Sequence, residues 1–130
     1  MTIFSRIIAG EIPSYKVAEN PDFYAFLDIN PITKGHVLVV PKKEVDYLFD
    51  LDDKTLGDMV VFSKQVANAM KKAIPCKRIG VTVIGLEVPH AHIHLVPITK
   101  ESDILFNQRR QKLTPEEFKK IAAAIAENFE

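Results

Sequence analysis

The chain alternates histidine with apolar residues along one stretch, Pro89-His90-Ala91-His92-Ile93-His94-Leu95-Val96-Pro97. Successive side chains of a β-strand point to opposite faces of the sheet. A strand over residues 91–96 would turn the three histidines to one face, spaced roughly 7 Å apart along the strand. The apolar residues between them would face the core. Because the chain has only 4 histidines, three in strict alternation indicate a functional site.

The sequence around this stretch predicts four further strands and two substantial helices. Short apolar and β-branched runs predict strands over residues 16–19, 23–27, 36–40 and 78–84. Apolar residues three and four apart predict a long helix from Asp52 or Asp53 to about Lys72. Thr114-Pro115-Glu116-Glu117 is a capping box that begins a C-terminal helix, and Thr2 can cap a short helix over residues 3–9. Most connections between strands are too short for parallel crossovers, so we expect an α+β fold with an antiparallel sheet of about five strands.

Composition and charge narrow the class of protein. A chain of 130 residues without internal repeats or linkers is expected to form one domain over residues 1–130. Because 17 basic residues balance 17 acidic ones, neither nucleic acid nor an anionic membrane is an expected partner. Basic pairs such as Arg109-Arg110 are interpreted as solvated surface. No secretory signal or apolar run of ~18 residues is found, and the lone Cys76 suits a reducing compartment, so we expect a cytoplasmic protein.

Spacing alone leaves two chemical interpretations of the histidines open. Neutral imidazoles are good zinc ligands, although the outer two, roughly 13 Å apart along a strand, would not easily share one ion. The other interpretation is nucleophilic catalysis. Neighbouring imidazoles disfavour each other's protonation, so the middle ring, that of His92, is expected to stay neutral and able to attack phosphorus. The flanking rings would then assist the developing charge and the leaving group.

The segment His90-Ala91-His92-Ile93-His94-Leu95-Val96 resembles the signature of the histidine triad (HIT) proteins, in which three histidines alternate with apolar residues. Four further blocks resemble the Hint-like branch of that family: Ile3-Phe4-Ser5-Arg6-Ile7-Ile8, Glu11-Ile12-Pro13, Ala25-Phe26-Leu27-Asp28-Ile29-Asn30-Pro31 and Gly35-His36-Val37-Leu38-Val39-Val40-Pro41-Lys42. The resemblance implies a HIT-like fold, with one long central helix and a C-terminal helix on a five-stranded sheet. It also implies a homodimer, for which we expect the helix face with Ser63, Ala67 and Met70 to be the contact.

The resemblance further implies an activity and assigns roles by position. The family's pattern is that of a nucleotide-binding hydrolase of the phosphoramidase type, acting on the α-phosphate of purine nucleoside monophosphate derivatives without a metal or other cofactor. His92 would be the nucleophile and would carry the nucleotide covalently. His94 and His36 would bind the phosphate and orient the nucleophile, and His90 would assist. Asp28 matches the carboxylate that holds the ribose hydroxyls.

The nucleotide-binding residues that the resemblance implies are mostly apolar. The lining of the purine slot would consist of Ile3, Phe4, Ile7, Phe26 and Ile29. Two positions before the histidines depart from or vary within the family pattern: Leu86 stands where glutamine is usual, and Glu87 stands where some members have Ser or Thr and others Glu. We expect Glu87 near the nucleotide. Because Leu86 removes a polar group beside the phosphate, the alternative function is a nucleotide-binding sensor or scaffold module with little turnover.

Overall fold

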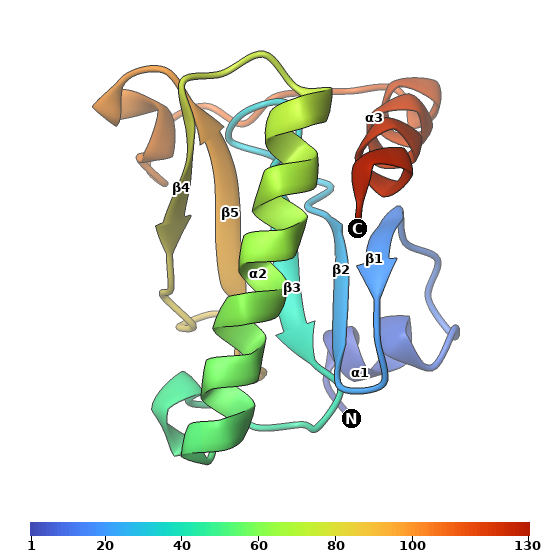
Figure 1. The fold of residues 1–130 in the computed structure, drawn as a ribbon, viewed down its shortest axis with the longest axis vertical. Coiled ribbons are helices and arrows are strands. Elements are labelled where there is room, and N and C mark those ends of the chain that lie inside the picture. Colours follow the sequence, from blue (N-terminus) through green and yellow to red (C-terminus); the bar gives the residue numbers. More distant parts are fainter.

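Five strands form one antiparallel sheet in the computed structural model, which describes residues 1–130 (Figure 1). The strands are β1 (Lys16–Glu19), β2 (Phe23–Leu27), β3 (Val37–Pro41), β4 (Arg78–Thr82) and β5 (Ile93–Ile98). Their order across the sheet is β1-β2-β3-β5-β4, and every neighbouring pair is antiparallel. The predicted α+β class and antiparallel sheet are confirmed. The last strand, β5, lies between β3 and β4 and so brings distant parts of the chain together.

Three helices begin where the sequence predicts them. The helices are α1 (Ile3–Ile8), α2 (Asp53–Ala73) and α3 (Pro115–Asn128). Their N-caps are Thr2, Asp52 and Thr114, and each of these side chains accepts a hydrogen bond from a backbone N–H of the first turn. Two short 3₁₀ turns, η1 (Leu48–Asp50) and η2 (Glu101–Ile104), have no counterpart in the predictions. None of the helices combines the length and the apolar character needed to cross a bilayer.

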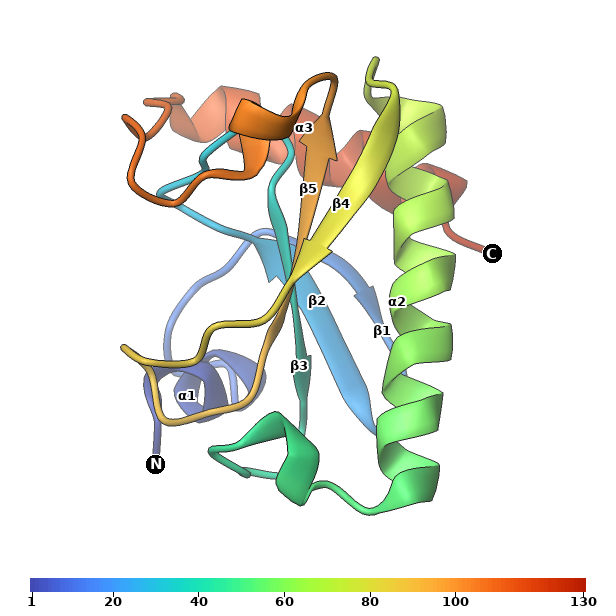
Figure 2. The same cartoon turned by 90° about the vertical axis from the view of Figure 1, so that its left-hand side faces the viewer.

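The helices cover the two faces of the sheet unequally. α2 and α3 lie on one face, and α1 lies on the other (Figure 2). The main core fills the space between the sheet and α2, where Phe62 and Met70 are almost fully buried. Ser63 is also buried. Of the expected dimer contact formed by Ser63, Ala67 and Met70, Ser63 and Met70 are wrong because both pack inside the chain, whereas Ala67 is half-buried.

A second, smaller apolar cluster lies on the α1 face. Its members come from the short helix and from two central strands: Phe4, Ile7, Tyr24, Phe26, Leu38 and Val40. Alternation along β2 and β3 produces both clusters, since neighbouring residues of a strand face opposite sides. Ala25 and Val39 thus belong to the main core, while Phe26 and Leu38 face α1.

The segment that carries the histidines is less regular than the predicted strand. β5 begins at Ile93 rather than at residue 91, so only His94 of the three histidines lies in the strand. Before it, the backbone N–H of Ala91 donates to the carbonyl of Val45 at 2.7 Å, a partner outside the sheet. The alternation nevertheless persists, because Ala91 and Ile93 are both buried in the main core. β4 is also shorter than predicted and ends at Thr82.

Candidate functional site

A row of side chains crosses the α1 face of the sheet from β2 to β5 and includes His94. Phe26 pairs with Leu38 across β2 and β3, and Leu38 pairs with His94 across β3 and β5. Directly paired residues in a sheet point to the same face. The ring of His94 therefore lies on the α1 face, next to the smaller apolar cluster. The ring of His92 follows on that side, with its centroid 4.9 Å from that of His94.

The ring of Phe4, on α1, closes one side of the site. Its centroid lies 5.1 Å from that of His92 and 5.7 Å from that of His90, in each case edge to face. It also meets Phe26 at 5.6 Å. The short helix is capped by Thr2 and ends where Gly10 adopts a positive φ of 81°. The cap at Thr2 and the turn at Gly10 thus fix the short helix that holds the Phe4 ring against His90 and His92.

His92 has one ring nitrogen held and the other free of a protein hydrogen bond. Its Nδ1 lies 2.7 Å from the backbone carbonyl oxygen of His90. A carbonyl oxygen can only accept, so Nδ1 carries the proton that is donated. In the neutral ring, Nε2 then keeps an unshared electron pair. The irregular backbone before β5 is thus part of the site, because it supplies this acceptor.

His36 and His94 form a buried pair whose tautomers follow from their partners. The backbone N–H of Ile32 donates to Nδ1 of His36 at 3.2 Å, so Nδ1 is unprotonated. Nε2 of His36 therefore carries the proton and donates to Nδ1 of His94 at 2.9 Å. This leaves the proton of neutral His94 on Nε2. His36 is completely buried, which suits a residue that orients His94.

Burial keeps both members of this pair uncharged. It lowers the pKa of His36 to about 3, with smaller contributions from His94, Arg110 and His92. It also lowers the pKa of His94 to about 3, with contributions from His92 and Arg110. The nearby carboxyl of Asp28 is 3.7 Å from Nε2 of His36 and accepts a hydrogen bond from the backbone of Asn30. Burial raises the pKa of Asp28, and the hydrogen bond from Asn30 lowers it by a smaller amount.

His90 is held by hydrogen bonds from two other parts of the chain, and Glu44 in turn holds one of them. Its Nε2 donates to the carbonyl oxygen of Pro41 at 2.8 Å, and its Nδ1 lies 2.7 Å from the hydroxyl of Thr2. Ser5 donates its hydroxyl proton to the carboxylate of Glu44 at 2.6 Å, and the backbone N–H of Thr2 donates to the same carboxylate oxygen. Burial is the largest influence on His90 and lowers its pKa. Nothing in the sequence pattern linked Glu44 to the histidines.

The predicted apolar lining is divided between buried and exposed residues. Phe4, Ile7 and Phe26 belong to the smaller cluster. Ile3 and Ile29 are respectively 49% and 66% exposed, which leaves them free to contact a ligand.

The two variant positions before the histidines lie on the surface loop between β4 and β5. Leu86 is 88% exposed, and Glu87 is exposed beside it. Neither side chain has a hydrogen-bond or ion-pair partner in the structure. No contact in the structure therefore supports the predicted role of Glu87 near the nucleotide, which stays a prediction.

Two site residues come from the C-terminal segment, where the sequence pattern pointed to none. The ring of Phe106 meets His94 edge to face, with centroids 4.7 Å apart, and it meets His36 at 5.9 Å. The guanidinium of Arg110 lies over the Phe106 ring, 5.3 Å from its centroid. Arg110 also donates to the carbonyl oxygen of Asn30 at 2.6 Å. Arg110 is half-buried and packs on Phe106, a contact that its interpretation as solvated surface did not include, whereas Arg109 is exposed as expected.

One cluster has the donor set of a metal site. Ligand atoms of Asp28, His36 and His94 lie within 4.8 Å of one another. Two of those atoms, Nε2 of His36 and Nδ1 of His94, already share a proton in a 2.9 Å hydrogen bond. A metal ion would have to displace that proton. The group that converges is thus not the three alternating histidines that the zinc interpretation considered.

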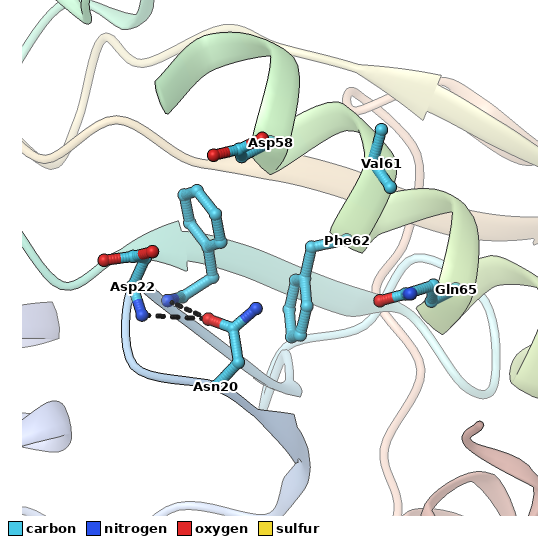
Figure 3. A pocket seen from close by; sticks show the side chains of 7 residues that line it. Asn20, Asp22, Asp58, Val61, Phe62 and Gln65 are labelled. Atoms are coloured by element: carbon cyan, nitrogen blue, oxygen red, sulfur yellow. Dashed lines mark hydrogen bonds between the residues drawn. The ribbon is translucent and has the colours of Figure 1, made fainter. Parts of the chain in front are cut away.

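A hollow of about 210 Å³ lies elsewhere, between the β1–β2 turn and α2 (Figure 3). Asn20, Asp22, Phe62 and Gln65 are among its lining residues. The side-chain oxygen of Asn20 accepts from the backbone N–H groups of Asp22 and Phe23, which is the usual geometry of an Asx turn. No histidine lines this hollow, and the side chain of Asn20 serves the turn.

Comparison with known proteins agrees with this geometry. A model of the HIT domain matches residues 9–101. An uncharacterised HIT-like protein of Borreliella burgdorferi is 37% identical over 98% of this chain and 97% of its own length. The adenosine 5'-monophosphoramidase HNT1 of Saccharomyces cerevisiae is 41% identical over 73% of this chain, which corresponds to 61% of the yeast protein. The crystal structure of a Hit-like protein involved in cell-cycle regulation from Bartonella henselae superposes with a TM-score of 0.84, at 32% identity over 98% of this chain and 96% of that one. The chain therefore belongs to the HIT family.

Proposed function

We propose that this protein is a nucleotide-binding hydrolase of the phosphoramidase type, which acts on the α-phosphate of purine nucleoside monophosphate derivatives. The observation that carries the proposal is the hydrogen bond from Nδ1 of His92 to the His90 carbonyl. It holds the proton on one ring nitrogen and leaves the other as a nucleophile. The similarity to the yeast adenosine 5'-monophosphoramidase supports the same chemistry.

The reaction would proceed in two displacements at phosphorus. In the first, Nε2 of His92 forms a bond to the α-phosphorus, and the bond from phosphorus to the leaving amine breaks. The amine would leave with a proton from a solvent water, because neutral His94 cannot lose its only ring proton without becoming an anion; the resulting hydroxide is neutralised when the water of the second step gives up its proton. Nε2–H of His94 would instead hydrogen-bond a phosphoryl oxygen. In the second step, a water molecule attacks phosphorus, the bond to Nε2 breaks, and nucleoside monophosphate and the free imidazole are released.

The nucleoside would lie between the histidines and the exposed apolar side chains. The carboxylate of Asp28 can accept hydrogen bonds from both ribose hydroxyls. Ile3 and Ile29 are exposed and could enclose a base, with Phe4 behind them. Binding in this orientation would direct the 5'-phosphate toward His92.

Replacement of the nucleophile tests the proposal. His92→Asn should abolish hydrolysis of adenosine 5'-phosphoramidate, because the asparagine amide is not nucleophilic, while the affinity for adenosine 5'-monophosphate should change less than about threefold. Turnover is measured by product release and affinity by calorimetry. Wild-type turnover in this variant would exclude a covalent intermediate on His92.

A second candidate function is nucleotide binding with little turnover. The observation that favours it is Leu86, which is exposed at the position where the family usually has a polar glutamine. If the wild-type protein binds adenosine 5'-monophosphate but hydrolyses none of a panel of phosphoramidates, this second function is correct.

The homodimer implied by the family resemblance also remains a proposal. The outer edge of β4 is unpaired in the sheet, and Val81 on this strand is 62% exposed. An exposed apolar edge strand is prone to pair with another chain. Sedimentation velocity over a range of protein concentrations would reveal a dimer or a monomer.

A further inference from the structure

The histidine site contains little positive charge of its own. His36 and His94 are neutral near pH 7, since burial lowers the pKa of each to about 3. Asp28 adds a carboxyl group at 3.7 Å from His36. A nucleoside monophosphate derivative carries negative charge, which the neutral imidazoles of His36 and His94 and the carboxyl group of Asp28 would not balance. Recognition of such a substrate therefore calls for a cation from another part of the chain.

Arg110 supplies a cation at this place. Its guanidinium is stacked on Phe106, and Phe106 in turn contacts His94, so a single aromatic ring separates the charge from the site. Among the lysine and arginine side chains, it is the one whose charge influences the pKa of Asp28, His36 and His94. Arg109, the preceding residue, is exposed and has no such influence.

The orientation of Arg110 is fixed by neutral partners. One Nη donates to the carbonyl oxygen of Asn30 at 2.6 Å, and the next residue, Gln111, donates its backbone N–H to the carbonyl oxygen of Pro31 at 2.8 Å. No carboxylate lies within ion-pair distance of Arg110, unlike Lys16 or Lys42, which pair with Glu19. An arginine has five N–H donors in a planar fork. Most of these donors, and the full charge, thus remain available to a ligand.

We propose that Arg110 is a specificity-determining residue that binds the anionic phosphate group of the substrate, with Phe106 as the platform that directs it. The inference rests on the proposed function and deepens it, because it identifies the negative charge of the ligand as the feature that the C-terminal segment recognises. Arg110 takes no part in bond making; it contributes affinity for the phosphate and leaves the nucleoside to Asp28 and the apolar side chains.

Binding of a charged and an uncharged ligand tests this role. Arg110→Gln removes the charge and keeps a polar side chain of similar reach. Its affinity for adenosine 5'-monophosphate, measured by calorimetry, should fall about 10- to 100-fold, the usual effect of losing a charge-assisted hydrogen bond. Its affinity for adenosine, which lacks the phosphate, should stay within about twofold of wild type. Arg110→Lys should recover part of the lost affinity because it restores the charge.

Arg109→Gln is the matched control, since it changes the net charge by the same amount at the adjacent position. It should bind both ligands as wild type does. The affinity of the wild-type protein for adenosine 5'-monophosphate should weaken with added salt, and this dependence should be shallower in Arg110→Gln.

Two results would overturn the inference while leaving the proposed function intact. The first is unchanged binding of adenosine 5'-monophosphate by Arg110→Gln, and the second is an equal loss of affinity for both ligands, which would show a purely structural role. A wild-type protein that binds neither ligand would instead refute the proposed function, and the inference with it.

Discussion

The hydroxyl of Thr2 takes part in two interactions at once. It accepts the backbone N–H of Ser5 as the N-cap of α1, and it hydrogen-bonds Nδ1 of His90 at 2.7 Å. His90 in turn provides the carbonyl that holds Nδ1 of His92. One hydroxyl therefore connects the start of the chain to the orientation of the proposed nucleophile.

Substitutions of Thr2 separate these effects. Thr2→Val should destabilise the protein by about 1–2 kcal/mol through loss of the cap, and should lower kcat about fivefold with little change in KM. Thr2→Ser keeps the hydroxyl and should behave as wild type in both respects. Thermal unfolding and steady-state kinetics provide the two measurements. A normal kcat in Thr2→Val would confine the role of this residue to the helix.

Among the secondary-structure elements, two glycines have opposite effects on the stability of the fold. Gly35 leads into β3 with a positive φ of 92°, and a Cβ there would collide with the side chain of Ile74 at the end of α2. Gly57 lies within α2, where an added Cβ would meet nothing within 4 Å. The first glycine is required by its backbone and its neighbour, whereas the second costs α2 helix propensity.

Alanine at these two positions should therefore change stability in opposite directions. Gly35→Ala should lower the free energy of unfolding by about 2 kcal/mol, since an L side chain is strained in this conformation. Gly57→Ala should raise it by about 0.5–1 kcal/mol. Urea unfolding of both variants decides the matter, and changes of the same sign would contradict the assignment of these roles.

For the whole molecule, the buried histidines make stability depend on pH. The pKa of His36 and His94 is about 3 in the folded chain, against 6.5 for the free group. Between these values the unfolded chain binds protons that the folded chain does not, so the free energy of unfolding increases with pH. Stability that is present at pH 7 is thus lost progressively as the pH falls below about 6.5.

The expected slope follows from the number of protons. Between pH 6 and 5, each of the two histidines should contribute up to about 1.4 kcal/mol per pH unit. The carboxylates with lowered pKa titrate below this window. Urea unfolding at several pH values gives the slope. His36→Asn should reduce the slope by about 1.4 kcal/mol per pH unit, which corresponds to one proton. A stability that is flat between pH 7 and 5 would show that the pair is accessible to protons when folded.

The parts of the site that could be predicted share a local physical cause. Side-chain alternation placed Ala91 and Ile93 in the core and the histidines on the opposite side, although β5 starts later than predicted. Capping side chains predicted the starts of α2 and α3, because a cap and its N–H donor are only three residues apart.

Tertiary structure alone decided the partners of those residues. His36 meets His94 across 58 positions of sequence, and Thr2 meets His90 across 88. Arg110, one of two adjacent arginines, contacts the site because the segment after β5 folds back onto the loop at Asn30. The alternation of the three histidines with apolar residues follows from the sequence alone, because extended backbone turns successive side chains to opposite sides even before β5 begins. Which tautomers they adopt, and which cation lies beside them, depended on long-range contacts that no local pattern encodes.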